Sequence, residues 1–513
     1  MSRIANRPAP ESRPARSARR LLAAFGAGLG LAACVHDLSA VRTAPGTAAS
    51  SGVAWKPPAG PPAQPAAAPA PGTGPVPAAS QAPGASSGAA IPSDLLESAR
   101  NWGLDDLVDL SLRLSPETRA AWARARAAAA DLGSKRGAYY PTIGVSTDLT
   151  RTKGAAVGGR FTFEQTSANP YVVLNYLLLD FGGRKSSVEE TRQALFAADL
   201  THNAAIQDVV LKVEQGYYQY LLARRLQQAE TAAVTEAQAS LDAAERRRAS
   251  GLSTVADVLQ AKTRLSQARL SLETVEGEIL TVRGVLATAI GLPANTPFDV
   301  AMPEDDPSLP VITDSVESSI AKAQAARPDL AAARARVLEA QAHIGKVRAE
   351  ARPNLSATYT QGRIYYQVDS LHQDTYSTGL LLRIPVFNGL SHQYDTLKAR
   401  AEADAAGADL ETLERMVIDQ VWSSYYNLKT AAQKVATSRD LIDSARQSHE
   451  VIAARYQAGV GSILDLLTAE SALENARAQE AQARTDLLLS LAQLAHDTGT
   501  LWRGVVTDTK GTP

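Results

Sequence analysis

SPETRAAWARARAAAADLGSKRGAYYP, residues 115–141, returns later in the chain as RPDLAAARARVLEAQAHIGKVRAEARP, residues 327–353. The two stretches align without gaps. Further matches follow along the chain at an offset of about 208 residues, as expected when one structural unit is used twice. The matched landmarks are Pro116 with Pro328, Gly133 with Gly345, Pro141 with Pro353, Phe181-Gly182-Gly183 with Phe387-Asn388-Gly389, Tyr217-Tyr218 with Tyr425-Tyr426, and Gly291 with Gly499.

Each copy is predicted to begin with a helix, over 116–139 and 328–351, and to continue as a β-hairpin. Pro141 and Pro353 end these helices, because a proline ring cannot continue a helix interior. Apolar and polar residues then alternate with the period of a strand. The alternating positions are Ile143, Val145, Thr147 and Leu149 in the first copy, and Leu355, Ala357 and Tyr359 in the second.

A polar loop (153–168, 364–374) and a returning strand (170–181, 375–387) are predicted to complete each hairpin. The second returning strand carries an apolar face made of Leu380, Leu382, Ile384 and Val386. Strands of about ten residues have the length of tilted transmembrane strands. The alternative is a pair of soluble hairpins packed on helices. The twofold repetition and the lipid anchor described below both argue against it.

A long helix with an apolar seam is predicted after each hairpin, from Gly183 to Ala249 and, in the second copy, to about Ala458. At a rise of 1.5 Å per residue the first would be about 100 Å long. A turn containing Gly251 or Gly459 reverses the chain, and a second helix returns to about Ile290 or Asp497.

These elements predict an oligomer. No stretch after the N-terminal region is apolar enough for a membrane helix, and lipid accepts strands only in closed barrels. Four strands are too few to close one, since the smallest membrane barrels have about eight. Several copies are therefore expected to share a barrel.

The only cysteine, Cys34, follows a basic segment and a short apolar run that ends in Leu-Ala-Ala. This arrangement is typical of a signal peptide over 1–33, and it resembles the lipobox of bacterial lipoproteins. The resemblance implies a lipid on Cys34, with an ordinary secretory signal as the alternative. Residues 34–92 are rich in proline and alanine and are predicted to form a disordered tether.

Composition argues against several other functions. Removal of 1–33, with six arginines and one glutamate, leaves 46 basic and 52 acidic residues, a balance that does not indicate nucleic-acid binding. The seven histidines lack ligand spacing and no P-loop is present, so no metal, other cofactor or enzymatic activity is expected.

The chain resembles the TolC-like outer-membrane efflux channels over about 93–500. The paired turns RRRASGLSTVADVLQA (246–261) and RYQAGVGSILDLLTA (455–469), and the hairpin ends LDFGGR and PVFNGL, carry the resemblance. It implies a homotrimer with a twelve-stranded β-barrel, four strands from each chain, continuous with a long antiparallel α-helical barrel. It also implies a bacterial outer-membrane protein that extends into the periplasm, with a periplasmic adaptor and an inner-membrane pump as partners.

The same resemblance assigns the site residues. The turns would bind the adaptor through Gly251, Leu252, Ser253, Gly459, Val460 and Gly461. Asp465 and Asp257 are assigned to the channel gate, with Asp465 facing the pore. Helix capping is the alternative and is favoured for Asp257. Tyr456 would bond Asp257 through its hydroxyl, so Tyr456→Phe would open the gate. The sequence departs from the family pattern at Thr468, in place of a second acid, and at Gly461, in place of an arginine.

The predicted organisation is therefore a signal peptide (1–33), a tether (34–92), two efflux repeats (93–314 and 315–500) and a tail (501–513). The predicted function is passive exit of drugs or other small toxic compounds from a tripartite pump. A channel for type I polypeptide secretion or metal efflux is one alternative. A periplasmic coiled-coil adaptor or scaffold is another, although repeated β-hairpins are not expected in such a protein.

Overall fold

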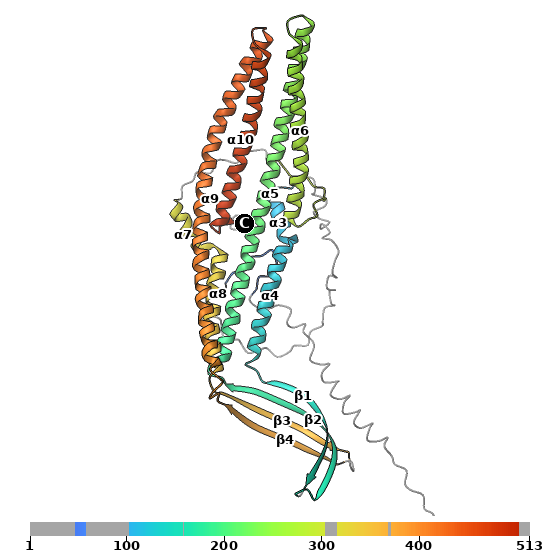
Figure 1. The fold of residues 1–513 in the computed structure, drawn as a ribbon, viewed down its shortest axis with the longest axis vertical. Coiled ribbons are helices and arrows are strands. Elements are labelled where there is room, and N and C mark those ends of the chain that lie inside the picture. The colour runs from blue at the N-terminus through green and yellow to red at the C-terminus, as the bar shows by residue number, and fades with distance from the viewer. Residues whose placement is uncertain (1–46, 58–101, 157, 303–314, 368–370, 502–513) are drawn as a thin grey trace, which may run out of the picture. The chain divides into compact units, whose positions relative to one another are not determined.

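The computed structural model describes residues 47–57, 102–156, 158–302, 315–367 and 371–501 (Figure 1). The chain forms two compact units. We call them the strand unit, made of Arg126–Leu195 and Ala335–Gly407, and the helical unit, made of the described residues within Thr47–Ala125, Phe196–Arg334 and Ala408–Pro513. Cys34, the signal peptide and most of the tether lie outside the described residues.

The long helices begin and end close to their predicted positions. The helices are α3 (Leu104–Leu114), α4 (Pro116–Gly137), α5 (Gly183–Ala249), α6 (Val255–Ile290), α7 (Val316–Ala326), α8 (Pro328–Glu350), α9 (Ser391–Gln457) and α10 (Ile463–Asp497). Both α5 and α9 have 67 residues. Proline is the first residue of α4 and of α8, a position where its missing N–H costs nothing. None of the described helices has the length and hydropathy needed to cross a membrane.

Two short helices, α3 and α7, were not expected, because each repeat was predicted to start at its proline. Each ends two residues before that proline, and its C-cap residue, Ser115 or Arg327, directly precedes the proline. Leu107, Val108 and Leu110 of α3 are buried, and this amphipathic spacing is the signal for the helix. They pack with Leu286 and Ile290 of α6 and with α5 in the largest apolar cluster.

Four helices of the helical unit follow one another side by side in the order α9, α10, α5, α6 (Figure 1). Leu428 and Val435 of α9 pack on Leu487 of α10. Arg477 of α10 pairs with Glu236 of α5 at 2.9 Å. The layer therefore ends in α9 on one side and α6 on the other.

The strand unit holds one antiparallel sheet, in the order β1-β2-β3-β4. The strands are β1 (Thr142–Ala156), β2 (Phe161–Leu179), β3 (Asn354–Tyr366) and β4 (His372–Arg383). They are longer than ten residues, and most of the predicted loops 153–168 and 364–374 are strand. Ion pairs between neighbouring strands, Arg151 with Glu164 and Arg363 with Asp374, give these polar positions partners within the sheet. The last predicted strand also ends early, so Ile384 and Val386 lie beyond β4.

Part of the predicted tether is ordered. Residues 47–57 dock on the helical unit, where Ala48 and Trp55 are buried. Asn203 of α5 accepts the backbone N–H of Trp55 at 2.7 Å and donates to its carbonyl oxygen at 2.8 Å. Trp122 of α4 donates to the carbonyl oxygen of Ala48 at 3.0 Å. Disorder throughout 34–92 was therefore the wrong prediction for this segment, because two tryptophans and an asparagine give it apolar and hydrogen-bonding partners.

Candidate functional site

Two tight turns close the helix hairpins at one end of the helical unit, one between α5 and α6 and the other between α9 and α10. Gly251 and Gly459 have φ values of 72° and 85°, in the left-handed region that favours glycine. The next residues, Leu252 and Val460, are each 70 % exposed. Ser253 and Gly461 are half-buried beside them. Each turn therefore presents one apolar side chain to the surroundings.

Asp257 takes part in the N-terminal cap of α6, the helix that follows the first turn. Its Oδ2 accepts the backbone N–H of Thr254 at 2.8 Å and the Ser253 hydroxyl at 2.9 Å, while Thr254 accepts the N–H of Asp257 at 3.2 Å. This is a reciprocal capping box at the N-terminus of α6. These hydrogen bonds lower the pKa of Asp257, because they favour its ionised form. The capping explanation for Asp257 is confirmed.

Asp465 occupies the matching place in α10 but has a different setting. Here Ser462 is the cap, accepting the N–H of Leu464 at 3.1 Å. Asp465 is exposed and forms no ion pair with any residue that the structure describes. Its carboxylate is therefore available to act on ions or on another chain, and its role in the gate stays a prediction.

Tyr456 does not form the expected bond to Asp257. The side chain is buried, only 4 % exposed, and its hydroxyl has no hydrogen-bond partner among the described residues. The predicted Tyr456–Asp257 hydrogen bond was wrong, because Asp257 is engaged in its own helix cap. Burial raises the pKa of Tyr456.

The residue that does reach Tyr456 is Arg247, near the end of α5. Its guanidinium lies over the Tyr456 ring, 4.8 Å from the ring centroid, and Nη1 donates to the Tyr456 carbonyl oxygen at 2.6 Å. In the sequence Arg247 belongs to the run ERRR (245–248), which has the composition of a solvated helix face. No local signal separated it from its neighbours, since its partner lies 209 residues away.

The backbone at Gly461 leaves no room for a side chain. A Cβ atom at this position would lie 2.9 Å from the backbone nitrogen of Tyr456 and 3.1 Å from the carbonyl carbon of Arg455. Backbone atoms cannot yield at such distances without moving the turn. A side chain of any length is therefore excluded from position 461 in this conformation.

Below the turns, an apolar cluster joins the two hairpins. It contains Tyr456 and draws the rest of its buried members from α5, α6 and α10: Ala237, Leu241, Ala244, Val258, Ala261, Leu265, Ala268, Ile463, Leu466 and Leu467. Farther along, Ser240 of α5 donates to Glu470 of α10 at 2.5 Å, and Arg264 of α6 pairs with Glu474 of α10. Burial raises the pKa of Glu470. The hairpins are thus joined by apolar and polar contacts over several helical turns.

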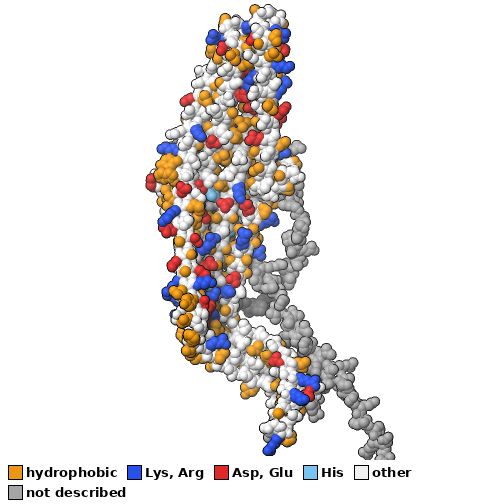
Figure 2. Space-filling model, viewed as in Figure 1, with side chains coloured by type: hydrophobic (Ala, Val, Ile, Leu, Met, Phe, Trp, Pro, Cys, Tyr) orange, Lys and Arg blue, Asp and Glu red, His pale blue; other side chains and the backbone are white. Residues whose placement is uncertain are grey.

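The sheet has two faces of different character. The strand register places one set of apolar and aromatic side chains on the same face: Ile143, Val145, Leu149, Val172, Leu174, Tyr176, Leu355, Ala357, Tyr359, Tyr376, Leu380 and Leu382. We call this the apolar face. The opposite face is mostly polar or small: Gly144, Ser146, Asp148, Thr150, Ser167, Asn169, Asn175, Ser356, Thr358, Thr360, Ser377 and Gly379. Charged side chains of the sheet gather toward the β1–β2 and β3–β4 loops (Figure 2).

The apolar face is not covered within the strand unit. Ile143, Leu149 and Leu380 are 69 %, 72 % and 71 % exposed. A sheet in water with one solvated face would carry polar residues there. Among the described residues of the strand unit, these leucines and isoleucines therefore differ from the residues of a solvated sheet face.

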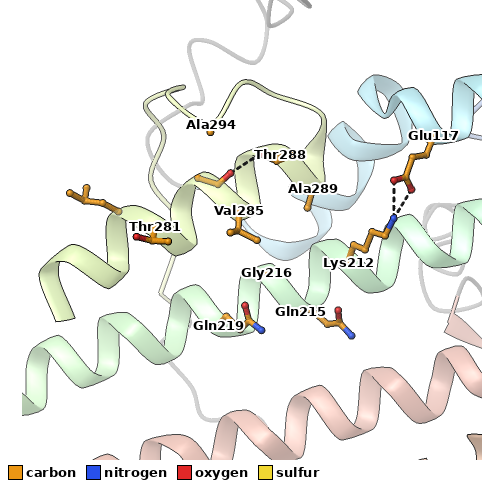
Figure 3. Close-up of a pocket in the computed structure, with 12 residues that line it drawn as sticks. Glu117, Lys212, Gln215, Gly216, Gln219, Thr281, Val285, Thr288, Ala289 and Ala294 are labelled. Atoms are coloured by element: carbon orange, nitrogen blue, oxygen red, sulfur yellow. Dashed lines mark hydrogen bonds and ion pairs between the residues drawn. The ribbon is translucent and has the colours of Figure 1, made fainter. Parts of the chain in front are cut away.

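An open pocket of about 810 Å³ lies between α5 and α6 in the helical unit (Figure 3). Gly216 and Gly284 are among its lining residues, and Glu117 pairs with Lys212 at one end at 2.7 Å. Within the described residues, no group of three or more histidine, cysteine, aspartate or glutamate side chains is arranged to hold a metal ion. The pocket offers neither a metal site nor a nucleophile paired with a base.

Family comparison decides what kind of protein this is. The model of the outer membrane efflux protein family matches residues 107–292 and 319–500. The chain belongs to this family. The two matched segments follow the internal repeat, and together they contain both turns and the sheet.

Individual proteins are similar to this chain over most of their length. Protein CyaE of Bordetella pertussis is 29 % identical over 404 residues, 76 % of this chain and 84 % of that protein. The outer membrane protein TolC of Escherichia coli is 24 % identical over 409 residues, 76 % of this chain and 80 % of that one.

Among solved structures, the outer-membrane channel OprN matches with a TM-score of 0.70 at 22 % identity, covering 78 % of this chain and 90 % of that one. The outer membrane protein VceC from Vibrio cholerae matches with a TM-score of 0.68 at 19 % identity, covering 77 % and 96 %.

The predicted resemblance, efflux function and outer-membrane location are confirmed by these comparisons. The fold is that of outer-membrane channel proteins, mainly helical with a four-stranded sheet. The family is a transport family. The lipid on Cys34, the gate roles of Asp465, Asp257 and Tyr456 and the adaptor-binding role of the turns stay predictions.

Proposed function

We propose that three copies of this chain form one exit duct across the outer membrane for a tripartite efflux system. The observation that carries the proposal is the four-stranded sheet with an exposed apolar face and a polar one. In a closed barrel the apolar face would contact lipid and the polar face would line the channel. The outer strands β1 and β4 each pair on one side only, so a neighbouring copy can extend the sheet at both.

The helical unit supports the same assembly. Helices α6 and α9, at the two ends of the helix layer, carry exposed apolar side chains. These are Leu259, Leu270, Leu280 and Val285 on α6, and Met416, Trp422, Tyr426 and Val451 on α9. Because the two sets lie on different surfaces of one chain, contact between copies would be head-to-tail, and a closing head-to-tail contact generates a ring. Twelve strands from three copies fall within the size range of membrane barrels.

The exposed turns are proposed to bind a periplasmic adaptor, which connects the duct to an inner-membrane pump. Leu252 and Val460 offer apolar anchors, and Gly251 and Gly459 fix the turn shapes that present them. A photo-reactive residue at Val460 should therefore cross-link to a different protein in living cells. The same residue at Trp422 should cross-link to a second copy of this chain. Adducts of this chain alone from Val460 would contradict adaptor binding, and the absence of a chain–chain adduct from Trp422 would contradict the ring.

Small toxic molecules are the proposed cargo. Among the relatives, one is a probable efflux pump outer membrane protein of Pseudomonas putida and one a pyoverdine export outer membrane protein of Pseudomonas aeruginosa. Polypeptide secretion is the second candidate, favoured by the 26 % identity to the alkaline protease secretion protein AprF of Pseudomonas aeruginosa. Deletion of the gene separates the two, because it would sensitise cells to small compounds in the first case and remove a protein from the culture medium in the second.

We further propose that Cys34 carries lipid after removal of residues 1–33. Mass spectrometry of the mature N-terminus should show a cysteine that bears acyl chains. Cys34→Ser should lack this mass while the channel still reaches the membrane, because burial of the apolar sheet face is a separate anchor. An unmodified thiol at the mature N-terminus would disprove lipidation.

A further inference from the structure

We propose that Arg247 is the latch between the two turns and holds the turn end of the duct closed. The inference rests on the proposed channel function. In this proposal a residue of the first repeat holds the two turns together. From the sequence, a Tyr456–Asp257 hydrogen bond was expected to have this role, and position 461 holds a glycine in place of an arginine. The geometry points to this residue through two contacts with a single partner, one with the ring of Tyr456 and one with its carbonyl oxygen.

The two contacts reinforce each other. A guanidinium placed over an aromatic face is attracted by the ring quadrupole, and this attraction strengthens where water is excluded. Tyr456 is 4 % exposed and Arg247 is half-buried, so both contacts are partly shielded from solvent. The 2.6 Å hydrogen bond from a charged donor to a backbone carbonyl belongs to the stronger class. Because its acceptor is a backbone atom of α9, this hydrogen bond forms only while the end of α9 stays beside α5.

Arg247 is set apart from the arginines on either side of it. Arg246 and Arg248 are exposed, and their side chains form no hydrogen bond or ion pair with the described residues. Only Arg247 faces the second hairpin. The three residues have the same charge and almost the same position on α5, which gives the structure its own matched controls.

The surroundings of the Arg247 guanidinium leave room for it over the Tyr456 ring. Gly459, whose Cβ position lies 4.0 Å from the Nη1 atom, leaves the space above the turn open. The positive charge of Arg247 also acts on Asp257, whose carboxylate is fixed by its cap at the start of α6. The direct contacts of Arg247 are to Tyr456, in the last helical turn of α9. Moving the two hairpins apart would break the stacking and the hydrogen bond together.

Loss of the latch should be visible in single channels. In planar bilayers, Arg247→Ala should raise the mean conductance of the full-length protein by about threefold to tenfold, the range expected when a stacked, hydrogen-bonded arginine is removed. Arg247→Lys should give an intermediate rise, because lysine keeps the charge without the planar donor. Arg248→Ala should behave as the unchanged protein.

Tyr456→Leu supplies an independent test, since it removes the ring but keeps a buried apolar side chain. It should raise conductance, and the effect of adding Arg247→Ala should be less than multiplicative, because both changes remove the stacking of the guanidinium on the ring. Equal conductance in Arg247→Ala and the unchanged protein would overturn the latch, as would equal rises in Arg247→Ala and Arg248→Ala. Absence of any conductance in the unchanged protein would instead contradict the proposed channel function.

Discussion

Leu380→Arg is expected to abolish stable insertion of the protein into the outer membrane. Leu380 lies on the apolar face of β4, opposite Ala357, and is 71 % exposed. An arginine on the lipid face of a membrane barrel costs about 2–4 kcal/mol near the bilayer midplane. In the proposed barrel of three copies the cost would be incurred three times. We therefore expect the variant to be lost from the outer-membrane fraction.

Leu381→Arg is the matched control, because Leu381 is the next residue and points to the opposite face. It lies opposite Ser356 and is itself 51 % exposed. If that face lines an aqueous channel, the arginine remains hydrated and the protein should insert and assemble. If both variants were lost from the outer-membrane fraction, β4 would tolerate an added charge on neither face. Insertion of Leu380→Arg at the normal level would refute the lipid-facing assignment and the shared barrel with it.

The contrast between helices and strands shows what a sequence determines locally. The C-terminal ends of α5 and α9 could be predicted because each is followed by a glycine with positive φ, Gly251 or Gly459, in a conformation that few other residues adopt. The strand ends could not be predicted, since charged residues such as Arg151 and Glu164 look like loop until their cross-strand partner is known. Pairing is a tertiary property, and it decided how far β1 and β2 extend.

The turn site divides in the same way. Asp257 could be identified as a cap from its sequence alone, because Thr254 precedes it by three residues in the pattern of a capping box. The contact between Arg247 and Tyr456 joins residues from different repeats, and nothing within either turn indicates it. The docking of 47–57 is a similar case. Its composition predicts disorder, and only Asn203 and Trp122, far along the chain, supply its partners.

Asp465→Asn should reduce the cation preference of the channel, and Asp465→Lys should reverse it. The two repeats use their matching acids differently: Asp257 is occupied by its cap, while Asp465 is exposed and Ser462 caps its helix instead. In a trimer the free carboxylate would appear three times around the opening. One carboxylate about 10 Å away in water roughly doubles the local concentration of a monovalent cation, so three raise it about eightfold at low ionic strength.

The measurement is the reversal potential across a bilayer in a gradient of potassium chloride, made at low and at high salt. The effect of Asp465→Asn should shrink at high salt, because the screening length falls to about 3 Å at 1 M. Glu245→Gln, which removes an exposed acid near the same end of α5, is the control for a general change in surface charge. Reversal potentials that shift equally in Asp465→Asn and Glu245→Gln would show that no acidic ring controls the opening. A normal cation preference in Asp465→Lys would place this side chain away from the pore altogether.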